Sequence, residues 1–109
     1  MQIKNIPFEI IGIENIEPEE HTGVTGKALW KTAKRGDFRI RIVEYSPGYL
    51  ADHWCQKGHI VFVLDGEFES ELSDGRKDTL AKGMCYLVSD NAEAQRSFTK
   101  IGAKLLIVD

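Results

Sequence analysis

The chain has 109 residues, a formal net charge of −3, and two cysteines. Mixed charges without a basic stripe argue against nucleic acid as a partner. The lack of an apolar run of about 20 residues argues against a membrane span. The first five residues also lack the apolar core of a signal peptide. We therefore expect one cytoplasmic domain over residues 1–109, with cysteines that stay reduced.

The first 26 residues are predicted to form an arm followed by a loop. Residues 3–11 alternate loosely and contain Pro7, which is typical of an edge strand or an extended arm. Pairing with a second subunit is one use that such an arm could have. Residues 14–26 are acidic and then glycine-rich, so we expect a loop with an exposed His21.

Residues 27–109 have the pattern of an antiparallel β-protein. Short apolar or alternating runs recur every 8 to 12 residues, turn residues separate them, and no helical period is present. Asp74-Gly75 is a strong hairpin signal between two of the runs. The pattern predicts an all-β sandwich or barrel. The expected strands cover residues 27–32, 38–45, 60–64, 67–72, 76–80, 84–88, 94–99 and 103–108.

The alternation in residues 38–45 also predicts which face of that strand is buried. Apolar residues stand at 38, 40 and 42, so we expect them to face the core. Arg39 and Arg41 are then expected on the exposed face. Cys85 is expected to be a small buried apolar residue.

Three side chains that bind soft metals lie within seven residues. His53 and Cys55 are two apart, so both point to one face if the segment is a strand. Gly58 permits a reversal, and a hairpin there would bring His59 beside the other two. Imidazole and thiolate ligands favour zinc, iron, nickel or copper over magnesium or calcium. The spacing lacks the two separated pairs of a zinc finger, which favours an open site.

Three other interpretations of these residues remain. They could be hydrogen-bonded core residues without a metal. Cys55 could be a nucleophile with His53 or His59 as its base. A blue-copper site also uses two histidines and one cysteine, but its ligands normally come from distant parts of the chain.

The central stretch resembles the first motif of the cupin family. That motif runs from a glycine through His-x-His and a glutamate to a second glycine. The matching positions here are Gly48, His53, Cys55, His59 and Gly66. Cys55 stands in place of the second histidine, and His59 stands in place of the glutamate.

The second cupin motif is matched more loosely. It begins at Gly83, has residues 89–91 where the family has Pro-x-Gly, and has Gln95 near the place of a histidine. The stretch Asp52-His53-Trp54-Cys55 is also similar to a group of small single-domain cupins described by an Asp-His-Cys-Trp motif.

This resemblance implies a small cupin-like β-barrel of two sheets, a jelly roll, that forms a homodimer and holds a metal or a small molecule inside. It gives the ligand roles to His53, Cys55 and His59 and extends them to Gln95. An amide oxygen at position 95 is a poor donor to a soft metal. Trp30, Tyr45 and Tyr86 are expected to form pocket wall.

The predicted function is binding, with or without conversion, of a small organic molecule at a transition-metal site that holds zinc, iron, nickel or copper. The alternative is a non-catalytic small-molecule sensor or binding module without a metal, because the family's glutamate and histidine are missing here. A third hypothesis is a dimeric scaffold. The sequence leaves open whether the protein is an enzyme, since cupins serve many functions on one architecture.

Overall fold

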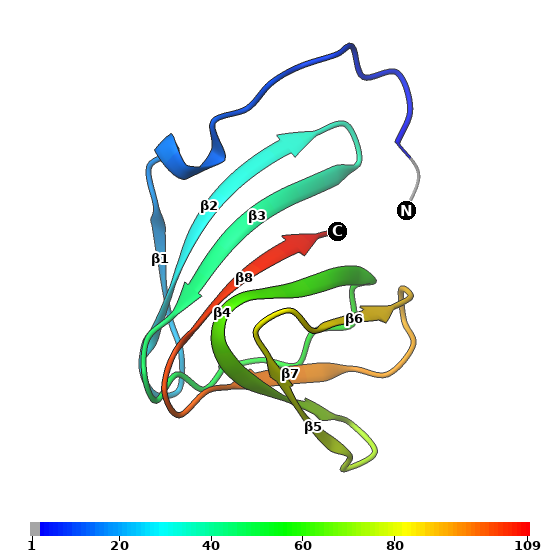
Figure 1. Cartoon of the computed structure of the whole chain (residues 1–109). Coiled ribbons are helices and arrows are strands. Elements are labelled where there is room, and N and C mark those ends of the chain that lie inside the picture. The colour runs from blue at the N-terminus through cyan, green and yellow to red at the C-terminus, as the bar shows by residue number, and fades with distance from the viewer. Residues whose placement is uncertain (1–2) are drawn as a thin grey trace.

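The computed structural model describes residues 3–109, so Met1 and Gln2 of the expected arm lie outside the described residues. The chain forms antiparallel strands arranged in two layers (Figure 1). Within the described part, no helix is long and apolar enough to cross a membrane. The elements are η1 Ile13–Asn15, β1 Glu19–Thr22, β2 Lys27–Arg35, β3 Phe38–Tyr45, β4 His59–Leu72, β5 Lys77–Ala81, β6 Cys85–Val88, β7 Gln95–Phe98 and β8 Ala103–Val108.

The strands form two sheets that share β4. The first sheet has the order β1-β2-β3-β8-β4-β6, and the second has the order β5-β4-β7. The first half of β4 pairs with β8 and β6, whereas its second half pairs with β5 and β7. The all-β fold is therefore confirmed. Its sheets form an open sandwich and not the closed barrel that was one of the two expected forms.

A glycine lets β4 pass from one sheet to the other. The sequence predicted two separate strands here, but residues 59–72 form one bent strand with a register shift between Val63 and Asp65. Gly66 has φ of 73°, and a Cβ at this position would overlap the carbonyl oxygen of Gly102. Only glycine combines this backbone conformation with such close contact.

The buried face of β3 is the opposite of the predicted one. Arg41 is 5% exposed and faces the interior with Val43, whereas Ile40 and Ile42 lie on the outer side. The outer side of β3 is covered as well, because η1 contacts β2 and β3 there. Ile42 is therefore buried although it faces outward. Period-two alternation shows that two faces differ but does not say which one faces inward when both are covered.

The first 26 residues contain more structure than expected. β1 lies inside the segment predicted to be a loop and pairs with β2, with His21 opposite Ala28. Residues 3–12 contain no strand and extend along the edge of the sandwich as an arm (Figure 1). The arm leaves Phe8 92% and Ile10 84% exposed.

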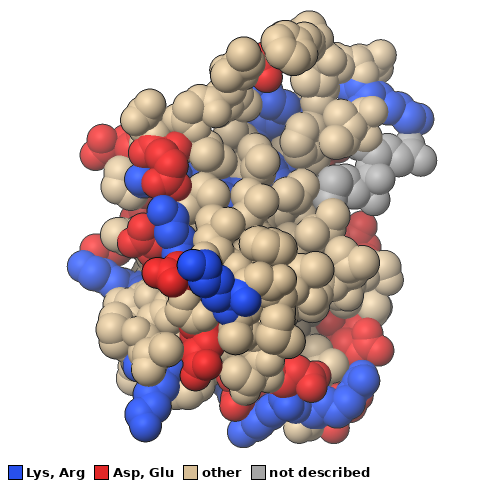
Figure 2. All heavy atoms as spheres, viewed as in Figure 1, with Lys and Arg blue, Asp and Glu red and all other residues tan. Residues whose placement is uncertain are grey.

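The outer side of the first sheet is apolar across four strands. One row of neighbours contains Ile42, Leu106, Phe62 and Cys85, and the next contains Ile40, Val108, Ile60 and Leu87. We call these two rows the outer apolar face. Cys85 is exposed there and not buried as predicted. Figure 2 shows this side, with few charged side chains over β8 and the first half of β4.

Candidate functional site

A small cavity of about 120 Å³ lies between the two sheets, and we call it the inner cavity. All seven side chains that the sequence placed at a metal site or pocket line it, namely Trp30, Tyr45, His53, Cys55, His59, Tyr86 and Gln95. Arg39 and Arg41 also line it, although the sequence placed both in solvent. The exposed-face prediction for these arginines is therefore wrong.

The predicted hairpin around Gly58 does not form. The segment before it runs beside β7, where the N–H of Cys55 donates to the carbonyl of Gln95 over 2.8 Å and the N–H of Gln95 donates back over 3.0 Å. His59 instead begins β4 in the first sheet. Cys55 and His59 therefore come from different sheets.

The amide of Gln95 connects these two sheets. Its NH2 group faces two carbonyl oxygens and donates to those of Cys55, over 3.0 Å, and Glu93, over 2.6 Å. Its oxygen is then left to accept from Nε2 of His59 over 2.9 Å. The hydroxyl of Tyr86 lies 2.9 Å from the same imidazole nitrogen. These contacts place the proton of the neutral imidazole on Nε2.

His59 is neutral at physiological pH. Burial lowers the pKa of its imidazole to about 4, and the charges of Arg41 and Arg39 act in the same direction. Its Nδ1 is buried and has no hydrogen-bond partner within residues 3–109. With the proton on Nε2, this Nδ1 is an unused acceptor.

Two arginines share one carboxylate behind the cavity. Arg39 donates from Nε and Nη2 to the two oxygens of Asp109 over 3.0 and 2.8 Å, and Arg41 donates from Nη2 over 3.0 Å. Burial alone would raise the pKa of the Asp109 carboxyl, but the Arg39 hydrogen bond and the charges of both arginines hold it below its usual value. The Asp109 side chain is 1% exposed, so this is a buried ion cluster.

The cluster leaves a positive charge at the cavity. Two guanidinium groups face one carboxylate, and no Asp or Glu in the described chain lines the cavity directly. Burial lowers the pKa of Arg41, and the charge of Asp109 acts in the opposite direction. Nε of Arg41 is buried and finds no partner within the described residues.

Aromatic side chains hold Arg41 in place. Its guanidinium lies 4.4 Å from the ring centre of Trp30, a cation–π contact. His21 stacks on the Trp30 side chain at 3.8 Å between ring centroids. His21 lies in strand β1 and not in the predicted loop, and its side chain is 36% exposed, so the expected exposure holds only in part.

Tyrosine hydroxyls supply neutral donors to the cavity. Burial raises the pKa of Tyr45 and of Tyr86, and it raises the pKa of Tyr49 to about 12. All three phenols therefore keep their protons at neutral pH. They add no negative charge to the cavity, although the hydroxyls of Tyr45 and Tyr86 already contact Ser97 and Ser70.

The predicted metal ligands do not fit a metal centre as they are arranged. Nowhere in residues 3–109 do three His, Cys, Asp or Glu side chains form a group that could hold a metal ion. The side chain of His53 is 64% exposed, and its Nδ1 lies 2.7 Å from Oδ1 of Asp52. Nε2 of His59 is engaged by Gln95 and Tyr86, so only its unpaired Nδ1 is left as a metal-binding atom. The metal role stays a prediction from sequence.

The chain is similar to known proteins in structure. No protein family model matches the chain, and no curated protein matches it by sequence. A predicted oxalate decarboxylase from Thermotoga maritima aligns with a TM-score of 0.77 at 15% identity, over 92% of this chain and 96% of the other.

Two further solved structures are similar to the chain. An RmlC-like cupin from Shewanella frigidimarina has a TM-score of 0.72 at 16% identity, over 97% of this chain and 92% of its own. An ectoine synthase from P. lautus has a TM-score of 0.73 at 16% identity, over 93% and 76%. At these identities the likeness shows the fold alone, which this chain shares with cupins. The narrower resemblance to the Asp-His-Cys-Trp group stays a prediction.

Proposed function

We propose that the protein binds a small organic monoanion, a carboxylate, in the inner cavity, with Arg41 as the anchor. The observation that carries this proposal is Arg41, a residue that lines the cavity and whose buried Nε has no partner in the described chain. Buried polar groups in folded proteins are almost always hydrogen-bonded. A buried charged donor without a protein partner is therefore a position that can bind a ligand oxygen.

The side-chain charges favour an anion. Arg39 and Arg41 carry two positive charges beside the one carboxylate of the Asp109 side chain, so these side chains attract a negatively charged group. A metal cation would meet two guanidinium groups, which disfavours it further.

The neutral groups around Arg41 suit a carboxylate as well. The hydroxyls of Tyr45 and Tyr86 are protonated donors beside the same space. Arginine and hydroxyl donors together satisfy the lone pairs of a carboxylate. This favours the binding-module hypothesis of the sequence analysis over the metal enzyme.

Calorimetric titration with sodium acetate and sodium propionate tests the proposal. The wild type is expected to bind one anion per chain, and Arg41→Gln is expected to weaken binding at least tenfold, since it removes a charge-assisted hydrogen bond. Arg41→Lys keeps the charge near Asp109 but lacks the Nε donor, so it also weakens binding. Lys82→Gln is the control, because Lys82 is exposed on the turn after β5 and does not line the inner cavity. Equal acetate binding by Arg41→Gln and wild type would contradict the proposal.

The outer apolar face supports a second proposal, that the protein acts as a homodimer. Phe62 is 37% exposed on this face, and the arm of the same chain presents the uncovered Phe8 and Ile10. A second copy is the occupant that accounts for both surfaces, because a two-fold pairing lets each arm cover the face of the other copy. Large contiguous apolar patches on a protein surface commonly mark such interfaces.

Sedimentation velocity at several concentrations tests the dimer. We expect a dimer for wild type and a monomer for Phe62→Asp, because a carboxylate would be buried without a partner. Val24→Asp is the matched control, since Val24 is 62% exposed on the loop after β1. A monomeric wild type, or a dimeric Phe62→Asp, would refute the assignment.

A further inference from the structure

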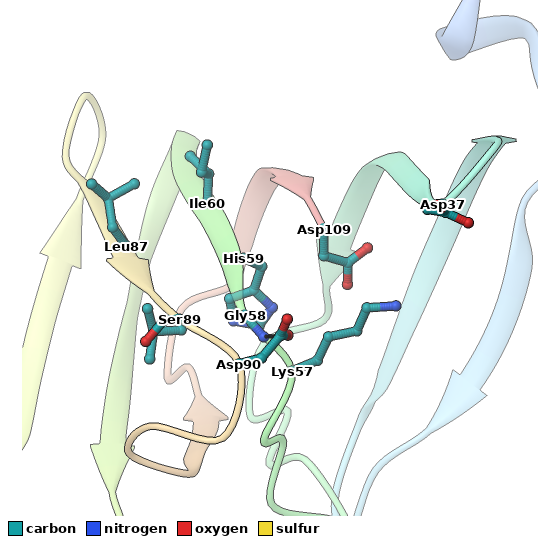
Figure 3. Close-up of a pocket in the computed structure, with 10 residues that line it drawn as sticks. Asp37, Lys57, Gly58, His59, Ile60, Leu87, Ser89, Asp90 and Asp109 are labelled. Atoms are coloured by element: carbon teal, nitrogen blue, oxygen red, sulfur yellow. Dashed lines mark hydrogen bonds between the residues drawn. The ribbon is translucent and has the colours of Figure 1, made fainter. Parts of the chain in front are cut away.

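A larger groove opens at the end of the sandwich next to the inner cavity. Its volume is about 730 Å³, and it lies between the start of β4, the end of β6, the β2–β3 turn and Asp109. Figure 3 shows Ile60 and Leu87 on one side of this groove and Lys57, Asp37 and Asp109 on the other. We call it the mouth groove.

The mouth groove and the inner cavity adjoin each other at His59. Among residues 3–109, only the His59 side chain lines both spaces. Asp109 lines the groove, and its carboxylate binds the arginines that line the cavity. His59 and the carboxylate of Asp109 therefore stand between the groove and Arg41.

The wall of the groove is fixed by backbone packing. Gly58 donates its N–H to Oδ1 of Asp90 over 2.6 Å, as the dashed line in Figure 3 marks. A Cβ at Gly58 would collide with the backbone of Ser89 and Asp90. The two loops thus meet at close range, and the groove exists before any ligand arrives.

One side of the groove is apolar and, in a single chain, exposed, and its Ile60 and Leu87 lie at the edge of the outer apolar face. Leu87 is 72% exposed and Ile60 is 40% exposed, and Val88 lines the groove next to them. The inner cavity, by contrast, is small. Because a water molecule takes about 30 Å³ in the liquid, the cavity offers space on the order of four water molecules. That is room for an anionic head group and little more.

We infer that the two spaces together bind a carboxylic acid with an unbranched apolar body, the carboxylate in the inner cavity and the carbon chain along Ile60, Leu87 and Val88. This inference rests on the proposed function, since Arg41 anchors the head group. It extends that function by naming the ligand class as medium-chain monocarboxylic acids.

A homologous series of sodium salts tests the inference by calorimetry: acetate, butyrate, hexanoate and octanoate. Affinity is expected to rise about two- to fourfold for each added methylene, because each one leaves water for the groove. Leu87→Ser should flatten this series, because octanoate loses more affinity than acetate. Ile101→Ser is the control, since Ile101 is 59% exposed away from the groove and should leave the series intact.

The outcomes separate the two proposals. If acetate binds through Arg41 but longer acids gain nothing, the chain-length inference fails and the proposed function stands. If no acid binds, the proposed function itself fails. If octanoate binds equally well to Arg41→Gln, binding is apolar adsorption without the anchored head group, which overturns the inference. Sedimentation of Leu87→Ser is measured in parallel, because Leu87 also belongs to the outer apolar face.

Discussion

The side-chain oxygen of Gln95 accepts a hydrogen bond from Nε2 of His59 over 2.9 Å. Because two backbone carbonyls hold the amide in this orientation, the contact requires a proton on Nε2 of the imidazole. Burial lowers the pKa of His59 to about 4 from an ordinary value of 6.5. The protein therefore folds around a histidine that cannot take up a proton near neutral pH.

Because the pKa of His59 is low in the folded chain, we expect the free energy of unfolding to fall in mild acid. Between pH 6.5 and about 4 the unfolded chain binds a proton at His59 that the folded chain does not bind. The free energy of unfolding therefore falls as the pH falls through this window, by at most about 3 kcal/mol from this group. Urea unfolding of wild type and His59→Gln at pH 7.0 and 4.5 measures the effect. The variant should lose less stability than wild type between the two values. Equal losses would show that His59 does not titrate in this way.

Removing the charge of Asp109 is expected to lower the stability of the protein and to strengthen its binding of anions. Asp109→Asn leaves Arg39 and Arg41 without a counter-charge, and breaking a buried pair of this kind costs about 3 to 5 kcal/mol. The same change leaves a second positive charge uncompensated at the inner cavity. We therefore expect sodium acetate to raise the melting temperature of Asp109→Asn more than that of wild type, relative to sodium chloride at equal ionic strength.

The control for this experiment is Asp74→Asn, which removes an exposed carboxylate from the β4–β5 turn. Its melting temperature should respond to acetate as wild type does. A response of Asp109→Asn no larger than that of wild type would mean that acetate does not reach the arginines.

The sequence predicted the strands well because they depend on local chemistry. The Asp74-Gly75 turn lies between β4 and β5, where Gly75 has φ of 94° and its N–H donates to the carbonyl of Leu72 over 2.9 Å. Turn residues and alternation act over a few neighbours, so they can be recognised in a single chain. The bend within β4 was missed, since it depends on the contact of Gly66 with Gly102.

The candidate site was predicted only in part, and the missing part depends on long-range contacts. His59, Cys55 and Gln95 were identified by residue type and motif spacing. Arg41 was assigned to the wrong face, because its partner Asp109 lies 68 residues away in sequence. A charged residue looks exposed in a local pattern, and only the folded chain shows the carboxylate that permits its burial.

Gly66 and Gly75 offer a test of the bend in β4. Both have positive φ, of 73° and 94°, but a Cβ meets the Gly102 backbone at Gly66 and nothing within 4 Å at Gly75. Gly75→Ala should lose about 1 to 2 kcal/mol of unfolding free energy through backbone strain alone. Gly66→Ala should lose clearly more, because strain and overlap add. Similar losses in chemical denaturation would show that the close contact at Gly66 is relaxed in solution.

The metal content of the purified protein distinguishes the metal site predicted from the sequence from the anion site that we propose at the arginines. His53, Cys55 and His59 line the inner cavity without forming a metal-binding group, and Arg39 and Arg41 place positive charge beside it. We expect elemental analysis of protein purified without tag or chelator to give far less than one metal per chain. Cys55→Ser should give the same result and should bind acetate as wild type does.

Gln95→His sharpens this comparison, because it supplies the imidazole that the second cupin motif carries. The change replaces an amide that donates to the carbonyls of Cys55 and Glu93 and accepts from His59. If the arginines exclude cations, the added imidazole will not produce stoichiometric zinc or nickel binding in calorimetry. About one metal per wild-type chain, lost in Cys55→Ser and retained more tightly in Gln95→His, would restore the metal site and place anion binding second. The arginine cluster would then balance the charge of a metal-bound thiolate.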